Sequence, residues 1–220
     1  MGLVAALEWL GKPYRLCRVD MLGEMRDPSY ARINGRHETP ALVTDEGRVV
    51  TETMAIAHWL AARDEEHRIS FAPRSQEADR LFQMMAFVNT GFTGAFSPLW
   101  TALELSRPDP AYEVALRRFG QEAVQQRHDM LETMIGETPY LVGDRPTLAD
   151  GLFVGVARWL EVHQAASPDR WPKIAALRRR LEDDPAVRYA LALENGEAAE
   201  GSGACQGHVP LGEVIVRYGR

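Results

Sequence analysis

The 220-residue sequence is short of cysteine, of excess basic charge and of long apolar runs, and each shortage excludes a class of protein. Its two cysteines, Cys17 and Cys205, are too few for a disulfide framework and are typical of a reducing compartment. A formal charge of −6, with no long basic stripe, argues against a nucleic-acid partner. Neither a signal peptide nor a membrane-spanning apolar run is visible, so we expect a soluble, cytoplasmic protein with no membrane partner.

The sequence also lacks the local motifs of metal and nucleotide sites. Its six histidines are scattered, with neither H-x-x-x-H nor C-x-x-C spacing, so no metal site is expected. Neither G-x-G-x-x-G nor G-x-x-x-x-G-K occurs, which excludes the common nucleotide-binding loops. The densest basic run, residues 178–180, lies between Leu177 and Leu181 and therefore predicts the solvated face of a helix.

The composition changes once, at a charged segment over residues 64–76 that contains Pro73 and is predicted to be a linker. Before it, the pattern mixes element types: a helix over 3–10, strands over 14–19, 41–44 and 48–51, and a helix from 53 to 62. After it, apolar spacings of three or four predict helices over 77–103, 111–135 and 148–162. The expected organisation is an α/β domain over 1–63, an all-helical domain over 77–195 and a tail over 196–220.

Two local features refine the helical part. Gly91, Gly94 and Pro98 predict a bend in the helix over 77–103. Thr147 and Asp150 have the spacing of a capping box, in which the Asp150 carboxylate accepts from the Thr147 N–H at a helix start.

Apolar side chains recur every fourth residue along the bent helix, at Val88, Phe92, Phe96 and Trp100. The same spacing serves core packing and the wall of a pocket for an apolar co-substrate. Packing is favoured for Val88 and Phe96, whereas both roles stay open for Phe92 and Trp100.

The most informative stretch runs from Thr39-Pro40 through an apolar run and a D-E-G turn to Glu52-Thr53, where an apolar helix begins. An X-Pro bond is more prone than others to be cis, and a bend there can leave the Thr39 N–H and C=O unpaired. Amides at a helix start attract a carboxylate, Thr53 adds a hydroxyl, and Glu52 can accept from an ammonium group. The stretch therefore predicts a site for a peptide ligand and its amino-acid head group.

These motifs, T-P-A-L, D-E-G and E-T-M-A-I, resemble the glutathione-binding core of the cytosolic glutathione transferases. Residues 143–150 resemble the family's helix-capping segment, and residues 95–100 resemble a segment of its bacterial beta-type members. The resemblance covers residues 3–193 and implies a thioredoxin-like α/β domain followed by an all-α domain. It also implies glutathione as co-substrate, a small hydrophobic electrophile, a homodimer, and a glutathione site made by four residues: Thr39, Pro40, Glu52 and Thr53.

Three departures from the family pattern bear on activity. The family's thiol-activating Ser, Cys or Tyr follows a first strand, and both would precede Met1, so no catalytic residue is identified. Where many relatives have N-P-x-G-K-V-P, residues 34–40 read N-G-R-H-E-T-P, so His37 replaces a glycine and Glu38 replaces a lysine. The His-Lys pair that beta-type members carry before A-F-S-P-L is replaced by residues 93–94, Thr-Gly.

Three explanations of the first departure stay open: a start recorded too far downstream, replacement of the strand by another segment, or a catalytically silent relative. Residues 212–218 are strand-like, but a short helix that begins after Pro210 and ends at Gly219 is favoured for them. The competing function is accordingly a non-catalytic binding or scaffold protein of the same fold.

Three other residues are candidates for thiol chemistry. His37 lies near Pro40 and could lower the pKa of a bound thiol, although a solvated loop histidine is favoured. Cys17 alternates with Arg18 in a predicted strand and is expected to pack in the core. Cys205 follows Gly-Ser-Gly in the tail, where an exposed thiol could form a mixed disulfide with glutathione.

Overall fold

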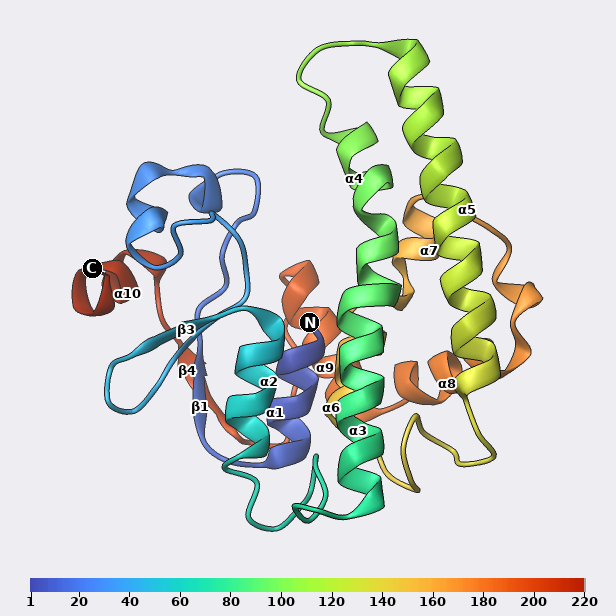
Figure 1. The fold of residues 1–220 in the computed structure, drawn as a ribbon. Coiled ribbons are helices and arrows are strands. Elements are labelled where there is room, and N and C mark those ends of the chain that lie inside the picture. The colour runs from blue at the N-terminus through green and yellow to red at the C-terminus, as the bar shows by residue number, and fades with distance from the viewer. Residues whose placement is uncertain (220) are drawn as a thin grey trace.

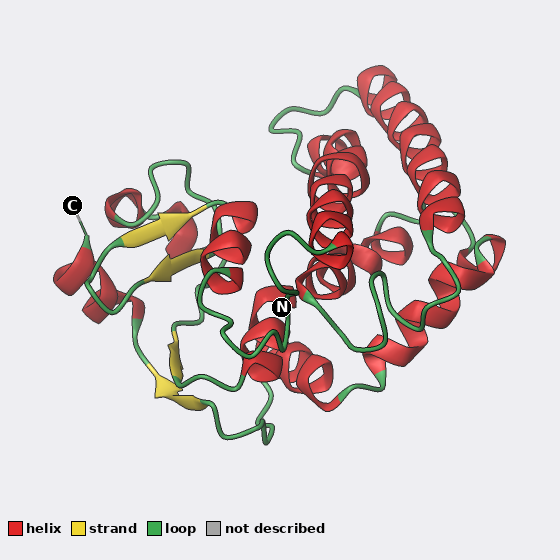
Figure 2. Ribbon diagram, turned by 60° about the horizontal axis from the view of Figure 1, so that its bottom comes forward, coloured by secondary structure: helices red, strands yellow, loops and turns green. Residues whose placement is uncertain are grey.

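The structure is a computed structural model that describes residues 1–219, and it contains an α/β part followed by a helical part (Figure 1). The α/β part consists of α1 (Gly2–Leu10), β1 (Tyr14–Leu16), the 3₁₀ turns η1 (Glu24–Arg26) and η2 (Pro28–Arg32), β2 (Ala41–Val43), β3 (Val49–Thr51) and α2 (Thr53–Ala61). The predicted combination of an α/β part with an all-α part is confirmed. Strands occupy one side of the molecule, as Figure 2 shows in yellow.

The helical part begins with a column of four consecutive segments: α3 (Gln76–Ala86), the π-helical η3 (Phe87–Thr93), η4 (Gly94–Phe96) and α4 (Ser97–Leu103). It continues with α5 (Pro110–Met134), α6 (Leu148–Ala157), α7 (Trp159–Val162), η5 (Pro168–Arg170), α8 (Pro172–Glu182) and α9 (Pro185–Asn195). The chain then returns to the α/β part with β4 (Cys205–His208) and α10 (Leu211–Tyr218).

The helix expected over residues 77–103 is not one continuous α-helix, and its irregular part includes the two glycines that predicted a bend. The backbone widens to π-helix over Phe87–Thr93 and tightens to a 3₁₀ turn at Gly94–Phe96 before α4 starts. Pro98 lies in the first turn of α4, where its missing N–H costs no helical hydrogen bond. The two glycines and the proline therefore change the helical pitch without ending the column.

The strands form two separate pairs. In the antiparallel pair of β2 and β3, Ala41 lies opposite Thr51 and Val43 opposite Val49. Side chains alternate between faces, so Leu42 and Val50 pack on the main core while Ala41 and Val49 pack on a second, smaller apolar cluster. β1 is shorter than the predicted 14–19 and pairs in parallel with β4.

The structure of the tail decides between a helix and a strand for residues 212–218. Residues 211–218 form the favoured helix, and its C-cap is Gly219. The segment that pairs with β1 is Cys205–His208, so the alternative in which residues 212–218 supply a strand is wrong. The reason is the pattern of burial: Leu211 and Ile215 are buried while Val216 is exposed, which is a helical and not an alternating arrangement.

The predicted capping box at the start of α6 is confirmed. Asp150 accepts from the Thr147 N–H at 2.9 Å and from the Thr147 hydroxyl at 2.7 Å, and its other carboxylate oxygen accepts from the Leu141 N–H at 2.9 Å. Complete burial raises the pKa of Asp150 to about 6, against hydrogen bonds that favour the ionised form. The box therefore fixes both the helix start and the preceding loop.

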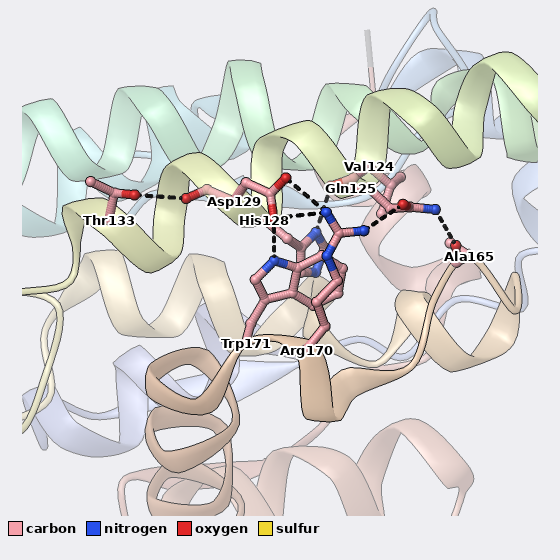
Figure 3. Close-up of polar contacts among 8 residues, drawn as sticks. All are labelled: Val124, Gln125, His128, Asp129, Thr133, Ala165, Arg170 and Trp171. Atoms are coloured by element: carbon pink, nitrogen blue, oxygen red, sulfur yellow. Dashed lines mark hydrogen bonds and ion pairs between the residues drawn. The ribbon is translucent and has the colours of Figure 1, made fainter.

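Polar contacts join α5 to the segment before α8 (Figure 3). Asp129 accepts from the Trp171 Nε1–H at 2.8 Å and pairs with the Arg170 guanidinium at 3.0 Å. His128, one residue earlier, is 1% exposed, and its Nδ1 lies 2.8 Å from the Val124 carbonyl oxygen. Burial lowers the pKa of His128 to about 4, so the ring is neutral at pH 7.

The basic run at residues 178–180 lies on α8, with Leu177 and Leu181 buried as predicted. Arg178 pairs with Glu161 and Glu182, and Arg180 donates to the Pro139 carbonyl. Within residues 1–219, no helix has both the length and the apolar character needed to cross a lipid bilayer.

Candidate functional site

The four predicted site residues lie at one end of the β2–β3 hairpin. The Thr39–Pro40 peptide bond is cis. Because Ala41 pairs with Thr51, Pro40 and Glu52 are the next residues outward along the two strands, and Thr53 follows as the first residue of α2. The register of the hairpin thus brings together two segments that are twelve residues apart in the sequence.

Thr39 presents its main chain to solvent. The residue is exposed, and within residues 1–219 neither its N–H nor its C=O has a hydrogen-bond partner. Unpaired main-chain groups at a strand end can pair with an extended peptide as another strand would.

Glu52 and Thr53 form the start of α2. Glu52 occupies the N-cap position with φ 69° and ψ 123°, a conformation that few non-glycine residues adopt. Its side chain makes no capping hydrogen bond, so it leaves the first amides of α2 available to another acceptor. A backbone held in a sparsely populated region beside uncapped amides is a feature that clusters at ligand sites.

Three charged side chains lie next to these backbone groups. Arg36 is bidentate to Glu38, with Nε–Oε2 at 2.9 Å and Nη2–Oε1 at 3.1 Å, and its Nε lies 3.7 Å from Glu52 Oε1. The contact with Glu38, and then with Glu52, raises the pKa of Arg36. All three side chains are more than half exposed, so the pairs are weak and open to exchange with a charged ligand.

Two buried side chains fix the loop before Thr39 by hydrogen bonds to its main chain. Tyr30 donates from its hydroxyl to the Glu38 carbonyl at 3.0 Å, and Asn34 donates from Nδ2 to the same oxygen at 2.8 Å. Tyr30 is 1% exposed and Asn34 6% exposed, so both donors are fixed by burial. These contacts orient the peptide unit that precedes Thr39.

Sequence reasoning missed Arg36, Tyr30 and Asn34. Arg36 occupies a position that varies in the family pattern, and only its alternation with Glu38 along the loop hinted at an ion pair. Asn34 matches the first residue of the family pattern N-P-x-G-K-V-P, but the pattern does not name its partner. Tyr30 carries no local signal, because its partner is a main-chain carbonyl eight residues away.

The three candidates for thiol chemistry do not join this site's charged groups. His37 lies in a loop as predicted but is only partly exposed, and its Nδ1 lies 2.8 Å from the Met25 carbonyl oxygen. Cys17 packs at the edge of the smaller apolar cluster, and burial raises its pKa, which disfavours a thiolate. Cys205 is half-buried in β4 instead of lying exposed in a flexible tail, because the strand pairs with β1.

Phe92 and Trp100, the two residues for which packing and pocket roles both stayed open, differ in burial. Phe92 is fully buried beside Phe153 and His128 and is therefore a packing residue, like Val88 and Phe96. Trp100 is half-buried against Trp159 and His163. Among the described residues, no group of three His, Cys, Asp or Glu side chains is arranged to hold a metal ion.

Comparison with family models matches both parts of the chain. Residues 2–63 match the model described as "Glutathione S-transferase, N-terminal domain", and residues 103–185 match "Glutathione S-transferase, C-terminal domain". The first match contains the whole candidate site, and the second contains the capping box of α6.

Individual relatives agree with these models. The chain is 30% identical over 191 residues to a maleylacetoacetate isomerase from Pseudomonas aeruginosa, covering 84% of this chain and 87% of the relative. It is 25% identical over 188 residues to the glutathione S-transferase GstA from Escherichia coli O157:H7, covering 84% and 88%. A glutathione transferase homologue from Sulfitobacter, crystallised with bound glutathione, superposes with a TM-score of 0.76 at 22% identity, covering 90% of this chain and 93% of that one.

Proposed function

The chain belongs to the glutathione S-transferase family, and on this basis we propose that it binds glutathione at Thr39, Pro40, Glu52 and Thr53. The solved homologue with bound glutathione supports this ligand, and the residues at the end of the hairpin fit its chemistry. Glutathione is an extended peptide with an amino-acid head group, which needs main-chain partners, an anion site and an acceptor for its ammonium group.

Each part of that ligand has a partner in the proposed arrangement. The unpaired N–H and C=O of Thr39 hydrogen-bond the peptide backbone of glutathione as an added strand would. The uncapped amides of α2 and the Thr53 hydroxyl hold the head-group carboxylate, and Glu52 accepts from the ammonium group. The observation that carries the proposal is the position of Glu52, with its positive φ and no capping side chain, at the same end of the hairpin as the unpaired main chain of Thr39.

We propose that the bound thiol is transferred to a small hydrophobic electrophile or reacts with glutathione disulfides. The thiol first loses its proton to solvent. The thiolate sulfur then forms a bond to a carbon of the electrophile, while the bond from that carbon to the leaving group breaks and the leaving group departs with the electron pair. Activity therefore requires a group that lowers the thiol pKa from about 8.5. The described residues near the hairpin end include no Ser, Cys or Tyr that we assign to this role. A homodimer in the cytoplasm, where thiols stay reduced, is part of the same proposal.

Calorimetric titration of the protein with reduced glutathione tests the binding site. Wild type should bind, and Glu52→Gln should weaken binding by about tenfold, because one charge-assisted hydrogen bond contributes about 1.5 kcal/mol. Glu46→Gln is the matched control, since Glu46 lies in the turn of the same hairpin, pairs with the exposed Arg48, and should leave affinity unchanged.

Activity is measured separately, with a chromogenic aromatic electrophile in the presence of glutathione. Turnover that Glu52→Gln reduces would support a transferase. Retention of glutathione without turnover would instead indicate a non-catalytic binding protein, and absence of binding by the wild type would refute the proposed site.

A further inference from the structure

The last segment of the chain packs against the loop that leads into the candidate site. This C-terminal strap, residues 204–219, begins beside β1, where the Tyr14 N–H donates to the Ala204 carbonyl at 3.0 Å. Further along, the Val209 N–H donates to the Leu16 carbonyl at 2.8 Å, and the two strands between these bonds run parallel. The strap is thereby attached to the α/β part before α10 starts.

α10 buries one face on that part. Leu211 is 7% exposed and Ile215 8% exposed, whereas Val216, on the opposite face, is 80% exposed. The two buried side chains form the smaller apolar cluster together with Tyr30 and Ile33. This cluster is distinct from the main core, so the residues around η2 depend on α10 for their cover.

The last residues of the strap also pack closely against the α/β part. Gly219 accepts through its carbonyl oxygen from Arg32 Nη2 at 3.3 Å. A Cβ at Gly219 would lie 3.0 Å from the Arg32 Cβ and 2.5 Å from the Ile215 carbonyl oxygen, so a larger residue cannot take this place without movement. Tyr218 lies against Gly47 in the hairpin turn, with 3.6 Å between its ring and the position of a Cβ there.

A short chain of contacts leads from the strap to the site. Ile215 and Leu211 pack in one cluster with Tyr30, and the Tyr30 hydroxyl donates to the Glu38 carbonyl. Glu38 directly precedes Thr39, whose main chain is unpaired. Displacing α10 would expose Tyr30 to water and remove the apolar support that fixes its hydroxyl.

We infer that the C-terminal strap positions the peptide-binding loop, with Leu211 and Ile215 acting through Tyr30 on the peptide unit before Thr39. One consequence of the inference rests on the proposed function: the affinity for glutathione depends on an apolar contact that is made outside the site. The strap is a positioning element and touches neither the ligand nor the reacting atoms.

Ile215→Asp is the variant that tests this inference, because it places a charge in the smaller cluster. In the intact protein, hydrogen exchange at the hydrogen-bonded amides of Arg36 and His37 should speed up at least tenfold, and the Kd for glutathione should rise by a similar factor. Ile215→Val keeps an apolar side chain of nearly the same shape, so the exchange rates and the Kd should stay near those of the wild type.

Two controls separate positioning from general loss of stability. Val216→Asp introduces the same charge on the exposed face of α10 and should change neither exchange nor affinity. Leu131→Ala removes a fully buried side chain from α5, far from the strap in sequence, and should lower the melting temperature without faster exchange at Arg36 and His37.

Tyr30→Phe covers the case in which Ile215→Asp fails to fold, since it removes only the hydroxyl and keeps the packing. It should speed exchange at Arg36 and His37, whose amides donate to Asn34, and weaken glutathione binding. Unchanged exchange in both Tyr30→Phe and Ile215→Asp would overturn the inference. If wild type does not bind glutathione, the proposed function fails, but the exchange rates still decide whether the strap orders the loop.

Discussion

His128 lies in the last third of α5, and its imidazole centroid is 4.5 Å from the ring centroids of both Phe92 and Trp171. Figure 3 shows His128 beside Trp171. Its pKa is about 4 in the folded protein, because burial disfavours the charged ring, compared with about 6.5 for an unfolded histidine. Between these two values the unfolded chain carries a proton that the folded chain does not. Stability should therefore fall as the pH drops below about 6.5 and level off near pH 4.

Comparison of wild type with His128→Leu isolates this contribution. Each pKa unit corresponds to about 1.4 kcal/mol, so wild type should lose about 2 kcal/mol relative to the variant between about pH 7.5 and about pH 5. Urea denaturation at both pH values measures the difference. Parallel pH dependences for the two proteins would show that His128 titrates normally in the folded state.

At the scale of elements, α4 and α5 approach each other closely at Gly120. A Cβ at this position would lie 2.6 Å from Leu99 Cγ and 3.3 Å from the Leu99 backbone nitrogen. Leu99 is fully buried, so its side chain has little room to move away. The glycine thus permits the helix contact at a cost in helix propensity of about 1 kcal/mol.

Gly120→Ala should therefore destabilise the protein by about 1–3 kcal/mol through overpacking, despite the better propensity of alanine. Gly94→Ala is the control, because a Cβ at Gly94 would have no heavy atom within 4 Å and the residue's φ is −60°. It should be neutral or slightly stabilising. Thermal unfolding compares the two, and a Gly120→Ala protein as stable as Gly94→Ala would contradict the close approach.

At the scale of the whole molecule, one apolar core runs through both parts. Ala5 and Ala6 of α1 are fully buried and belong to the same cluster as the residues of α6. The Trp9 Nε1–H donates to Asp184 Oδ1 at 2.9 Å, and Asp184 is itself the N-cap of α9. α1 is therefore shared between the two parts instead of serving the α/β part alone.

A shared core predicts one cooperative unfolding transition. Urea curves followed by far-UV circular dichroism and by tryptophan fluorescence should coincide, because neither part keeps its core when the other unfolds. A fragment of residues 1–75 should lack a cooperative transition for the same reason. Two separated transitions, or a stably folded fragment, would show that the parts are independent.

Local patterns were sufficient where a residue acts on its own neighbours in the sequence. Gly11 ends α1 in a left-handed conformation with φ 70°, as a glycine after an apolar helix predicts. The capping box at Thr147 and Asp150 and the irregular helix near Gly94 followed from the same kind of signal. The four predicted site residues were found from a motif whose parts are joined by a single hairpin, although their role as a site stays a prediction.

The sequence by itself therefore determined the α/β and helical parts, most of their elements and the family, because these follow from short-range preferences and from motifs. Only the tertiary structure decided that Arg36 lies between Glu38 and Glu52, that Tyr30 and Asn34 hold the Glu38 carbonyl, and that the tail returns to pair with β1. The Arg36–Glu52 pair joins side chains that are far apart in the sequence, and the other contacts, apart from the local Arg36–Glu38 pair, are made through main-chain atoms. Such atoms are the same in every residue, so the sequence carries no local sign of which partner they take.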